Sequence, residues 1–442
     1  MRKERFCLEG LGDWEVLVPT TVYPPREDTE LLCMAISRLA RHGGKAVEIG
    51  CGSGIVSIFL ASLGWEVTSI DVNPYAVSAT RGNLESHGFP SDRVIESGIG
   101  DGFEIPEGTE LLIWNIPYLD SEDDGSGLIS PIEVAALSDI PNGGWGGELL
   151  ELISESPSSI SREILVLLVL RTDPDSSSRI SDWESRGWSC RSLNSTRMGR
   201  EKIEVFGIWR TGFGLGATMI ESCASTMDEA KKFPGGGWQR VCSSEQTDGR
   251  GRRGSEWASR QGGLFATWAI ESKLLQSISP GVLQTSIGSI VANELGANMK
   301  WPNDIISQDG RKMGGVLVEA SEGSPIRVGV GANRHGFDEN GVTGSGWEET
   351  IGPMDSKEVF SRIDRSVSSF FEEAGILPGT PQETLVSISW ESLSVLLSRG
   401  AMLEVNGELV RPVGLNRRGE LETIGPRGHG VVAELDGTEW LL

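Results

Sequence analysis

The sequence has no long apolar run, no cysteine or histidine cluster and little positive charge, and each absence excludes a class of protein. No apolar run approaches the ~20 residues that a membrane-spanning helix needs. No apolar segment follows the N-terminal MRKERFCLEG, as a secretory signal would require. The six cysteines and four histidines are scattered without Cys-x-x-Cys spacing, which argues against a disulfide framework or a Cys/His zinc site. We therefore expect a reduced, cytoplasmic protein with no membrane-spanning segment.

The charge balance is strongly acidic, with 63 Asp and Glu against 39 Lys and Arg and a net charge of −24. The phosphates of nucleic acids attract basic faces, so this charge argues against a DNA-binding role. Solubility is the plainer interpretation of the acidity. The length of 442 residues predicts two or three domains of ~150 residues each.

The first half of the chain alternates helical and apolar strand patterns. Helical patterns cover 30–40, 54–64 and 73–88, and strand patterns cover 45–50, 65–71, 110–118 and 163–171, before a closing hairpin at 188–210. Such alternation predicts right-handed crossovers and a doubly wound α/β sheet. The glycine-rich segment 211–216 predicts a domain boundary, so the first domain covers residues 1–212.

A glycine loop joins the first of these strands to the next helix. In VEIGCGSG, Gly50, Gly52 and Gly54 allow a tight turn and a close approach to a ligand at a helix N-terminus. The spacing is GxGxG and differs from the GxGxxG of dinucleotide binders. Asp71 ends the following strand, where its carboxylate can accept hydrogen bonds from ribose hydroxyls. The loop and this acid together favour S-adenosylmethionine (SAM) as the ligand. Glu48 either faces the amino-acid part of that cofactor or caps the adjacent helix.

A second motif, Asn115-Ile116-Pro117-Tyr118, follows the fourth predicted strand. Ligands of open α/β sheets lie at this edge. A carboxamide and a backbone carbonyl can accept both N–H bonds of a planar amine, while an aromatic ring stacks on its face. Asn115, Pro117 and Tyr118 are therefore candidate catalytic residues that hold a planar nitrogen in line with a methyl sulfonium. The alternative is a strand end followed by a proline turn.

Residues 14–210 resemble the HemK-like glutamine-N5 methyltransferases, which modify the GGQ motif of class-1 peptide release factors. The resemblance is carried by the segment Val22-Tyr23-Pro24-Pro25-Arg26-Glu27-Asp28-Thr29, the glycine loop, Asp71 and the Asn115–Tyr118 motif. It implies a class I methyltransferase (Rossmann-like) fold and a release factor as substrate. The short archaeal and eukaryotic form is the closer likeness, which implies a small zinc-binding activator as a partner. The resemblance also implies a set of SAM-binding residues. These are Thr29, Glu48, Gly50, Gly52, Gly54, Asp71 and Asn115.

Ile116 departs from the Asn-Pro-Pro-Tyr of that family. Asn-Ile-Pro-Tyr is typical of ribosomal-RNA adenine dimethyltransferases, which also methylate a planar amine. An rRNA or other N-methyltransferase, or a non-catalytic binding module, therefore stays open as an alternative for this half.

Three motifs in the second half contain basic residues. Residues 249–254 read GRGRRG, a loop whose backbone N–H groups and guanidinium groups can wrap an anion. Lys300-Trp301-Pro302-Asn303-Asp304 and Arg311-Lys312-Met313-Gly314-Gly315 place two lysines twelve residues apart. An RNA-binding RGG tract is the alternative for the loop, but one short copy in an acidic chain disfavours it. These motifs predict a site where a nucleotide activates a carboxylate.

Residues 213–442 resemble the biotin–protein ligase family. The same motifs occur in the family's order, together with Ser225-Thr226, Gln246, Gly262-Gly263-Leu264 and Val328–Asn333. The resemblance implies an α+β catalytic domain of the class II synthetase type over 213–394, with an SH3-like β domain over 395–442. It implies that biotin reacts with ATP to give biotinyl-AMP, which then acylates a lysine of a biotin carboxyl carrier protein.

The resemblance also implies roles for individual residues. Lys312, Arg250 and Arg252 would be catalytic, by neutralising charge on the phosphoryl and carboxylate oxygens. Asp304 is the candidate Mg²⁺ ligand. The implied biotin-binding residues are Ser225, Thr226, Gln246, Gly249, Arg250, Trp257, Gly263, Lys312 and Gly315. The implied ATP-binding residues are Arg252, Trp257, Lys300, Asn303, Asp304 and Asn333.

Overall fold

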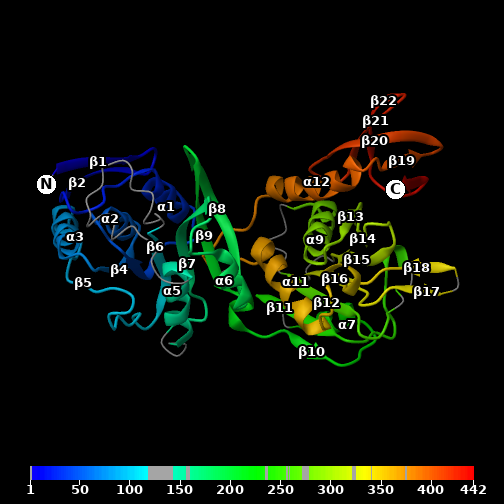
Figure 1. Ribbon diagram of the computed structural model, residues 1–442, viewed down its shortest axis with the longest axis horizontal. Helices are drawn as coiled ribbons and strands as arrows, with labels where there is room; N and C mark the ends of the chain where they lie inside the picture. Colours follow the sequence, from blue (N-terminus) through cyan, green and yellow to red (C-terminus); the bar gives the residue numbers. More distant parts are fainter. Residues whose placement is uncertain are drawn as a thin grey trace. The chain divides into compact units, whose positions relative to one another are not determined.

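The chain forms two compact units, each with its own core (Figure 1). The computed structural model describes residues 2–117, 143–155, 160–233, 237–254, 257, 259–270, 278–320, 325–339, 341–373 and 376–442. The first unit contains Met1–Gly214 and Glu373–Pro378, and the second contains Leu215–Glu372 and Gly379–Leu442. The main division therefore falls within the glycine-rich segment 211–216. Among the described helices, none has the length and apolarity to span a bilayer.

A seven-stranded sheet forms the centre of the first unit. In the order of the sheet, its strands are β5 (Val94–Glu96), β4 (Trp65–Asp71), β3 (Gly44–Ile49), β6 (Thr109–Asn115), β7 (Leu165–Asp173), β9 (Glu201–Arg210) and β8 (Trp188–Met198). The first five strands are parallel, and β9 is antiparallel to both β7 and β8. This topology confirms the doubly wound α/β sheet predicted from the sequence.

Apolar strands and capped helices explain this local structure. β6 and β7 read as continuous buried apolar runs, as expected for strands covered on both faces. Asn73 caps one helix by accepting from Tyr75 N, with Pro74 at the first helical position. The helices of this unit are α1 (Glu27–Ser37), α2 (Ile55–Ser62), α3 (Pro74–Ser86), α5 (Gly144–Glu155) and α6 (Ile180–Ser185), and a hairpin of β1 (Arg2–Leu8) and β2 (Gly12–Val18) precedes them.

The segment Glu373–Pro378 belongs to the first unit although it lies far along the chain. Ile376 and Leu377 are buried in the core of that unit. Ala40 N donates a hydrogen bond of 2.7 Å to Ile376 O. The sequence predicts this segment to be part of the ligase domain (213–394), because an apolar pair in a short loop gives no sign of the core that it joins.

A mixed sheet forms the centre of the second unit. Its main path is β10 (Thr218–Ile220), β11 (Trp238–Ser243), β12 (Leu264–Ile270), β16 (Ile326–Ala332), β15 (Lys312–Glu319), β14 (Asp304–Ile306) and β13 (Asn298–Lys300). The short strands β17 (Phe337–Glu339) and β18 (Val342–Gly344) pair with each other, and β18 also pairs with β15. The helices are α7 (Thr226–Glu229), α9 (Pro280–Glu294), α10 (Glu348–Ile351), α11 (Ser356–Phe371) and α12 (Gln382–Ser398). α9 and α11 lie side by side and pack on the sheet.

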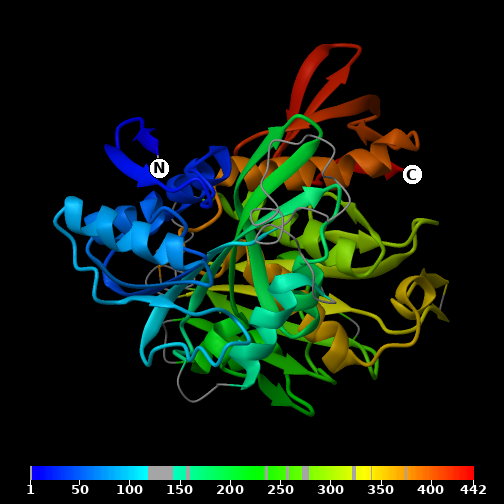
Figure 2. The same ribbon diagram turned by 60° about the vertical axis from the view of Figure 1, so that its left-hand side comes forward.

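The C-terminal residues form a separate five-stranded sheet within this unit. Its order is β22 (Gly428–Val432), β21 (Leu421–Gly425), β20 (Glu408–Leu415), β19 (Met402–Val405) and β23 (Thr438–Leu441). Figure 2 shows these strands (red) next to α12 (orange). Trp301 joins this sheet to the rest of the unit, because its Nε1 donates to Gly419 O at 2.8 Å and its O accepts from Trp440 Nε1 at 3.0 Å. An α+β unit with a small β domain is the fold class predicted for this half.

Candidate functional sites

A cavity of about 400 Å³ opens at the C-terminal ends of β3, β4 and β6 in the first unit. This edge is the topological switch point of the sheet, because β4 and β5 follow on one side of β3, and β6 and β7 on its other side. The cavity is lined by residues 50–53 of the glycine loop, Asp71, the segment Thr21–Arg26 and Asn115–Pro117, whereas Gly54, also predicted to bind SAM, is not among its lining residues. The fold thus gathers three segments that the sequence analysis assigned to one site. Tyr118 lies outside the described residues.

The glycine loop depends on backbone conformations that only glycine adopts readily. Gly50, Gly52 and Gly54 have φ values of 70°, 52° and 81°. A Cβ on Gly54 would lie 2.9 Å from Thr80 Cα. Asp71 holds the loop in place, because its Oδ2 accepts from Gly52 N at 2.9 Å and its Oδ1 accepts from Asn73 N at 2.9 Å. Asp71 therefore orders the loop as well as facing the cavity.

Glu48 is buried at the bottom of this cavity. It accepts a hydrogen bond from Ser57 Oγ, and that hydroxyl lies 2.7 Å from Ser69 Oγ. Burial, with a smaller contribution from the Asp71 charge, raises the pKa of Glu48 to about 8. Glu48 thus lines the cavity and also bonds a residue of α2, and its contact with the cofactor remains a prediction. Thr29 also lines the cavity, and its Oγ1 accepts from Arg26 N at 3.3 Å at the start of α1.

The side chain of Asn115 is oriented by an acid from a distant segment. Its Nδ2 donates to Asp28 Oδ2 at 2.9 Å. Its Oδ1 is buried, and no donor among the described residues reaches it. Asn115 is among the residues that line the cavity, so an N–H group of a bound ligand is a suitable donor for this oxygen.

Three cavity residues had no signal in the sequence. Trp145 lies in the first turn of α5, and the centroid of its ring is 6.2 Å from that of Trp114. Met198 and Glu201 come from the hairpin of β8 and β9. Arg171 Nη1 lies 3.1 Å from Glu201 Oε1 and holds this carboxylate. These residues reach the site only through the topology of the sheet, which explains why spacing did not indicate them.

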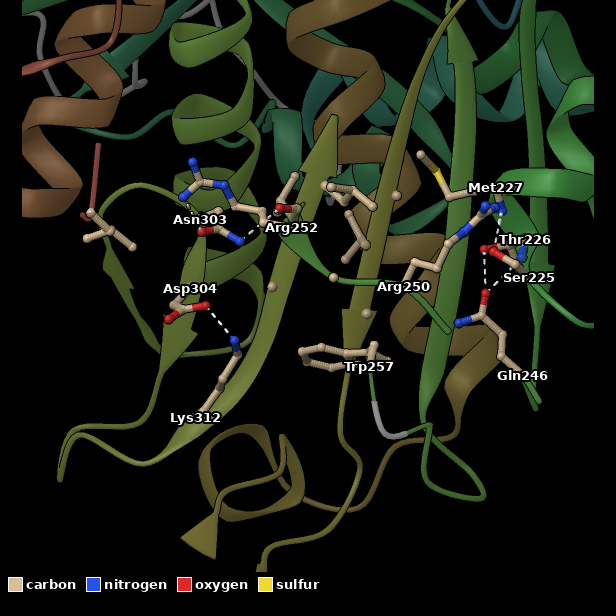
Figure 3. Close-up of a pocket in the computed structure, with 18 residues that line it drawn as sticks. Ser225, Thr226, Met227, Gln246, Arg250, Arg252, Trp257, Asn303, Asp304 and Lys312 are labelled. Atoms are coloured by element: carbon tan, nitrogen blue, oxygen red, sulfur yellow. Dashed lines mark hydrogen bonds and ion pairs between the residues drawn. The ribbon is translucent and has the colours of Figure 1, made fainter. Parts of the chain in front are cut away.

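A second cavity, of about 260 Å³, lies on the sheet of the second unit (Figure 3). It contains most of the biotin- and ATP-binding residues predicted from the sequence. Those that line it are Ser225, Thr226, Gln246, Arg250, Arg252, Trp257, Asn303, Asp304, Lys312 and Gly315. Four further predicted residues are not among its lining residues. These are Gly249, Gly263, Lys300 and Asn333.

Backbone contacts elsewhere in the unit explain where the four residues outside the lining lie. Gly249 O accepts from Trp257 N at 2.9 Å, and a Cβ on Gly263 would lie 2.9 Å from Ala332 O. Lys300 lies opposite Asp304 in the register of the antiparallel strands β13 and β14. Asn333 is buried, and its N donates to Met313 O at 2.8 Å. Their predicted contacts with ligand remain predictions.

Hydrogen bonds order one end of this cavity. Gln246 Oε1 accepts from Thr226 N at 2.8 Å and from Thr226 Oγ1 at 3.0 Å. Thr267 Oγ1, which the sequence analysis did not identify, donates to Thr226 Oγ1 at 2.9 Å from the neighbouring strand β12. Ser225 caps α7 by accepting from Met227 N. These fixed hydroxyl and amide groups can recognise a small polar ring.

Charged side chains occur along the whole cavity, with Lys312 and Asp304 at the end away from Thr226 and Arg250 beside Thr226 (Figure 3). Lys312 Nζ lies 2.6 Å from Asp304 Oδ1 and 5.3 Å from the centre of the Trp257 ring. Figure 3 shows Lys312 and Trp257 on the side away from Thr226. Arg250 forms an ion pair of 2.7 Å with Asp228, which raises the pKa of the guanidinium. Arg252 Nη1 reaches Asn303 Oδ1 at 3.5 Å. Three cations around one cavity suit an anionic ligand.

Two known protein families match separate parts of the chain. Residues 234–331 match the Biotin/lipoate A/B protein ligase family. Residues 26–116 match the Ribosomal protein L11 methyltransferase (PrmA) family. The C-terminal half therefore contains a biotin/lipoate ligase domain, and the N-terminal half contains a PrmA-like methyltransferase domain. The finer resemblance to HemK-like enzymes is carried by the sequence motifs alone.

Individual relatives match parts of the chain. The "Bifunctional ligase/repressor BirA" of Escherichia coli is 28% identical over 201 residues, or 41% of this chain and 60% of that protein. The "Biotin--[acetyl-CoA-carboxylase] ligase" of Paracoccus denitrificans is 31% identical over 141 residues, or 29% and 58%. The "Ribosomal protein L11 methyltransferase" of Campylobacter hominis is 35% identical over 75 residues, or 17% and 25%. The chain thus spans at most about 60% of the length of these relatives.

Among solved structures, the "Biotin protein ligase from Aquifex aeolicus in complex with biotin and ATP" matches with 22% identity and a TM-score of 0.39. The match covers 51% of this chain and 98% of that one.

Proposed function

We propose that the C-terminal unit is a biotin–protein ligase, which forms biotinyl-AMP from biotin and ATP and transfers biotin to a lysine of a carrier protein. The observation that carries the proposal is the convergence of Ser225-Thr226, Gln246, the arginine loop and Lys312 in one cavity. The family match over 234–331 supports it.

In this proposal the polar end of the cavity holds the biotin ring through Thr226 and Gln246. The biotin carboxylate attacks the α-phosphorus of ATP, and pyrophosphate leaves. Arg250, Arg252 and Lys312 stabilise the negative charge that grows on the oxygens. The carrier lysine then attacks the acyl carbon, and AMP leaves. Asp304 fits a role in holding Mg²⁺ together with phosphate oxygens, since Mg²⁺ commonly uses one or two carboxylates plus substrate phosphates. Among the described residues, no group of three His, Cys, Asp or Glu forms a metal site without substrate.

The Lys312→Ala variant tests the ligase proposal. We expect biotin-dependent ATP–pyrophosphate exchange to fall by about 10²-fold or more, because one preorganised cation typically contributes ~3 kcal/mol to the barrier. The exposed lysine of α11 provides a control, Lys357→Ala. Near-wild-type exchange by Lys312→Ala, with the fold intact by circular dichroism, would contradict the assignment.

We also propose that the N-terminal unit transfers a methyl group from SAM to the side-chain nitrogen of a protein glutamine, in the GGQ motif of a release factor. The supporting observation is that Asn115, whose Oδ1 has no donor among the described residues, lines the same cavity as residues of the glycine loop and of the segment 22–29. A small zinc-binding activator is part of this proposal, because the motifs resemble the short form of the family.

Tritiated SAM, offered with the release factor in the presence and absence of the small partner, tests this second proposal. Ribosomal protein L11 and ribosomal RNA serve as alternative acceptors, since the family match is to an L11 methyltransferase. We expect label on the GGQ glutamine, lost in Asn115→Ala. Label on L11 or RNA instead would replace the proposed substrate. Failure to bind SAM at all would leave a non-catalytic binding module.

A further inference from the structure

Asp28 lines the cavity of the first unit and is almost fully buried, with an exposed fraction of 1%. Its two carboxylate oxygens have different partners. Oδ1 accepts from Thr29 N at 2.7 Å and from Thr29 Oγ1 at 3.3 Å. Oδ2 accepts from Asn115 Nδ2 at 2.9 Å. The first pair of bonds fixes the carboxylate, so that its other oxygen is held against the Asn115 amide.

This contact determines which way the Asn115 amide points. A carboxylate can only accept hydrogen bonds, so the NH₂ end of the amide must face Asp28. The oxygen end must then face the opposite way, and Asn115 Oδ1 is the buried atom that no described donor reaches. Without Asp28, the NH₂ and the oxygen could exchange places at little cost. An amide with its NH₂ toward the cavity would repel an incoming N–H group.

We propose that Asp28 is a positioning residue for methyl transfer, which holds Asn115 with its oxygen directed at the acceptor nitrogen. The inference rests on the proposed methyltransferase function and deepens it, because it selects acceptors that donate an N–H bond. The carboxylate of Asp28 thereby acts on the acceptor through Asn115.

Exchanging the two side chains gives a sharp test. In Asp28→Asn the Asn115 amide loses its fixed partner, and we expect methyl transfer to fall by about 10- to 100-fold, the effect of one charged hydrogen bond. In Asn115→Asp two carboxylates face each other, and transfer is also low. The double variant Asp28→Asn/Asn115→Asp restores one donor and one acceptor, and a carboxylate oxygen faces the cavity whichever way the group turns. We expect it to exceed both single variants by about tenfold.

The assay measures methyl transfer from tritiated SAM to the purified release factor, with SAM affinity by calorimetry. We expect Asp28→Asn and Glu27→Gln to bind SAM with the affinity of the wild type. The neighbouring exposed acid provides a matched control, since Glu27→Gln removes the same charge from the first turn of α1 and leaves Asn115 untouched. Equal rates for Asp28→Asn and Glu27→Gln, or a double variant no better than the single ones, would overturn the inference.

A spectroscopic measurement separates this inference from the proposed substrate. The ¹⁵N side-chain amide signal of Asn115, bonded to a carboxylate, is expected to shift and to exchange faster in Asp28→Asn. If the wild-type protein does not label the release factor, the proposed substrate fails while this signal still decides the inference. An Asn115 amide signal unchanged by Asp28→Asn would overturn it.

Discussion

Single polar residues at both sites are held by partners that lie far away in the sequence. Asn115 is oriented by Asp28, 87 positions earlier, and Thr226 receives a hydrogen bond from Thr267, 41 positions later. A buried polar group that lacks such a partner costs ~1–3 kcal/mol. The hydrogen bonds that satisfy these polar groups therefore also hold each side chain in one orientation, as a binding site requires.

Glu48 gives a prediction for the dependence of stability on pH. Its pKa is about 8 in the folded chain, against an ordinary value of 4.5. A carboxyl group whose pKa is raised by folding keeps its proton in the folded state, so stability is full below about pH 4.5 and is lost as the pH rises to about 8. Glu48→Gln imitates the protonated group. In the absence of SAM, we expect the Tm of the variant minus that of the wild type to increase between pH 5 and about pH 8.

The control for this measurement is Glu85→Gln, at an exposed position. Its Tm difference from the wild type should stay constant over the same range. A constant difference for Glu48→Gln as well would show that the buried carboxyl does not titrate in this interval.

The buried side chain of Asp364 connects helix α11 to the sheet of the second unit through hydrogen bonds. Asp364 accepts from Trp268 Nε1 at 2.8 Å, from Arg240 Nε at 2.9 Å and from Trp238 Nε1 at 3.1 Å. Both members of the Asp364–Arg240 pair are nearly inaccessible to solvent. One side chain therefore satisfies three donors from two strands, β11 and β12.

Removal of this acid is predicted to destabilise the ligase unit strongly. Asp364→Ala would leave a buried guanidinium and two indole N–H groups without their partner, at a cost of about 3–5 kcal/mol. The same helix supplies a control, because Asp355 is its exposed N-cap, where Asp355→Ala should cost about 1 kcal/mol. Urea midpoints for loss of adenylate synthesis measure both. Equal midpoints for the two variants would show that the buried cluster contributes no more than an ordinary cap.

At the scale of the whole molecule, the chain does not divide at a single point. The core of the methyltransferase unit includes Ile376 and Leu377, from a segment between α11 and α12. Leu377 lies against Gly207 of β9, since a Cβ at that glycine would be 3.2 Å from Leu377 Cδ1. The first unit is therefore complete only when this late segment is present.

A truncation at the glycine-rich boundary would thus remove part of the first core, and a point variant tests this directly. Leu377→Ala should destabilise the methyltransferase unit by about 2–5 kcal/mol, because it leaves a cavity in a packed core. The measurement is the Tm of the transition that SAM shifts upward. Val395→Ala, at an exposed position of α12, is the control. An unchanged SAM-dependent transition in Leu377→Ala would contradict the assignment of this segment to the first core.

The sequence by itself determined the features that depend on local spacing. The alternation of helices and strands predicted the doubly wound sheet, and the glycine loop and the GRGRRG and KWPND motifs each contribute residues to the lining of a cavity. Such signals are readable because a turn conformation or a run of donors is set by residues a few positions apart.

Only the tertiary structure decided which distant residues share a site. Strand order and packing produce the Asp28–Asn115 bond and bring the Thr267 hydroxyl to Thr226. They also bring Trp145 and the residues of the β8–β9 hairpin to the cavity of the first unit, and Leu377 into its core. Lys300 and Asn333 carry suitable chemistry in suitable motifs, yet the fold leaves them outside the lining of the ligase cavity. The physical reason is that hydrogen bonds and cavity walls join positions brought together by the sheet, and no local pattern encodes that distance.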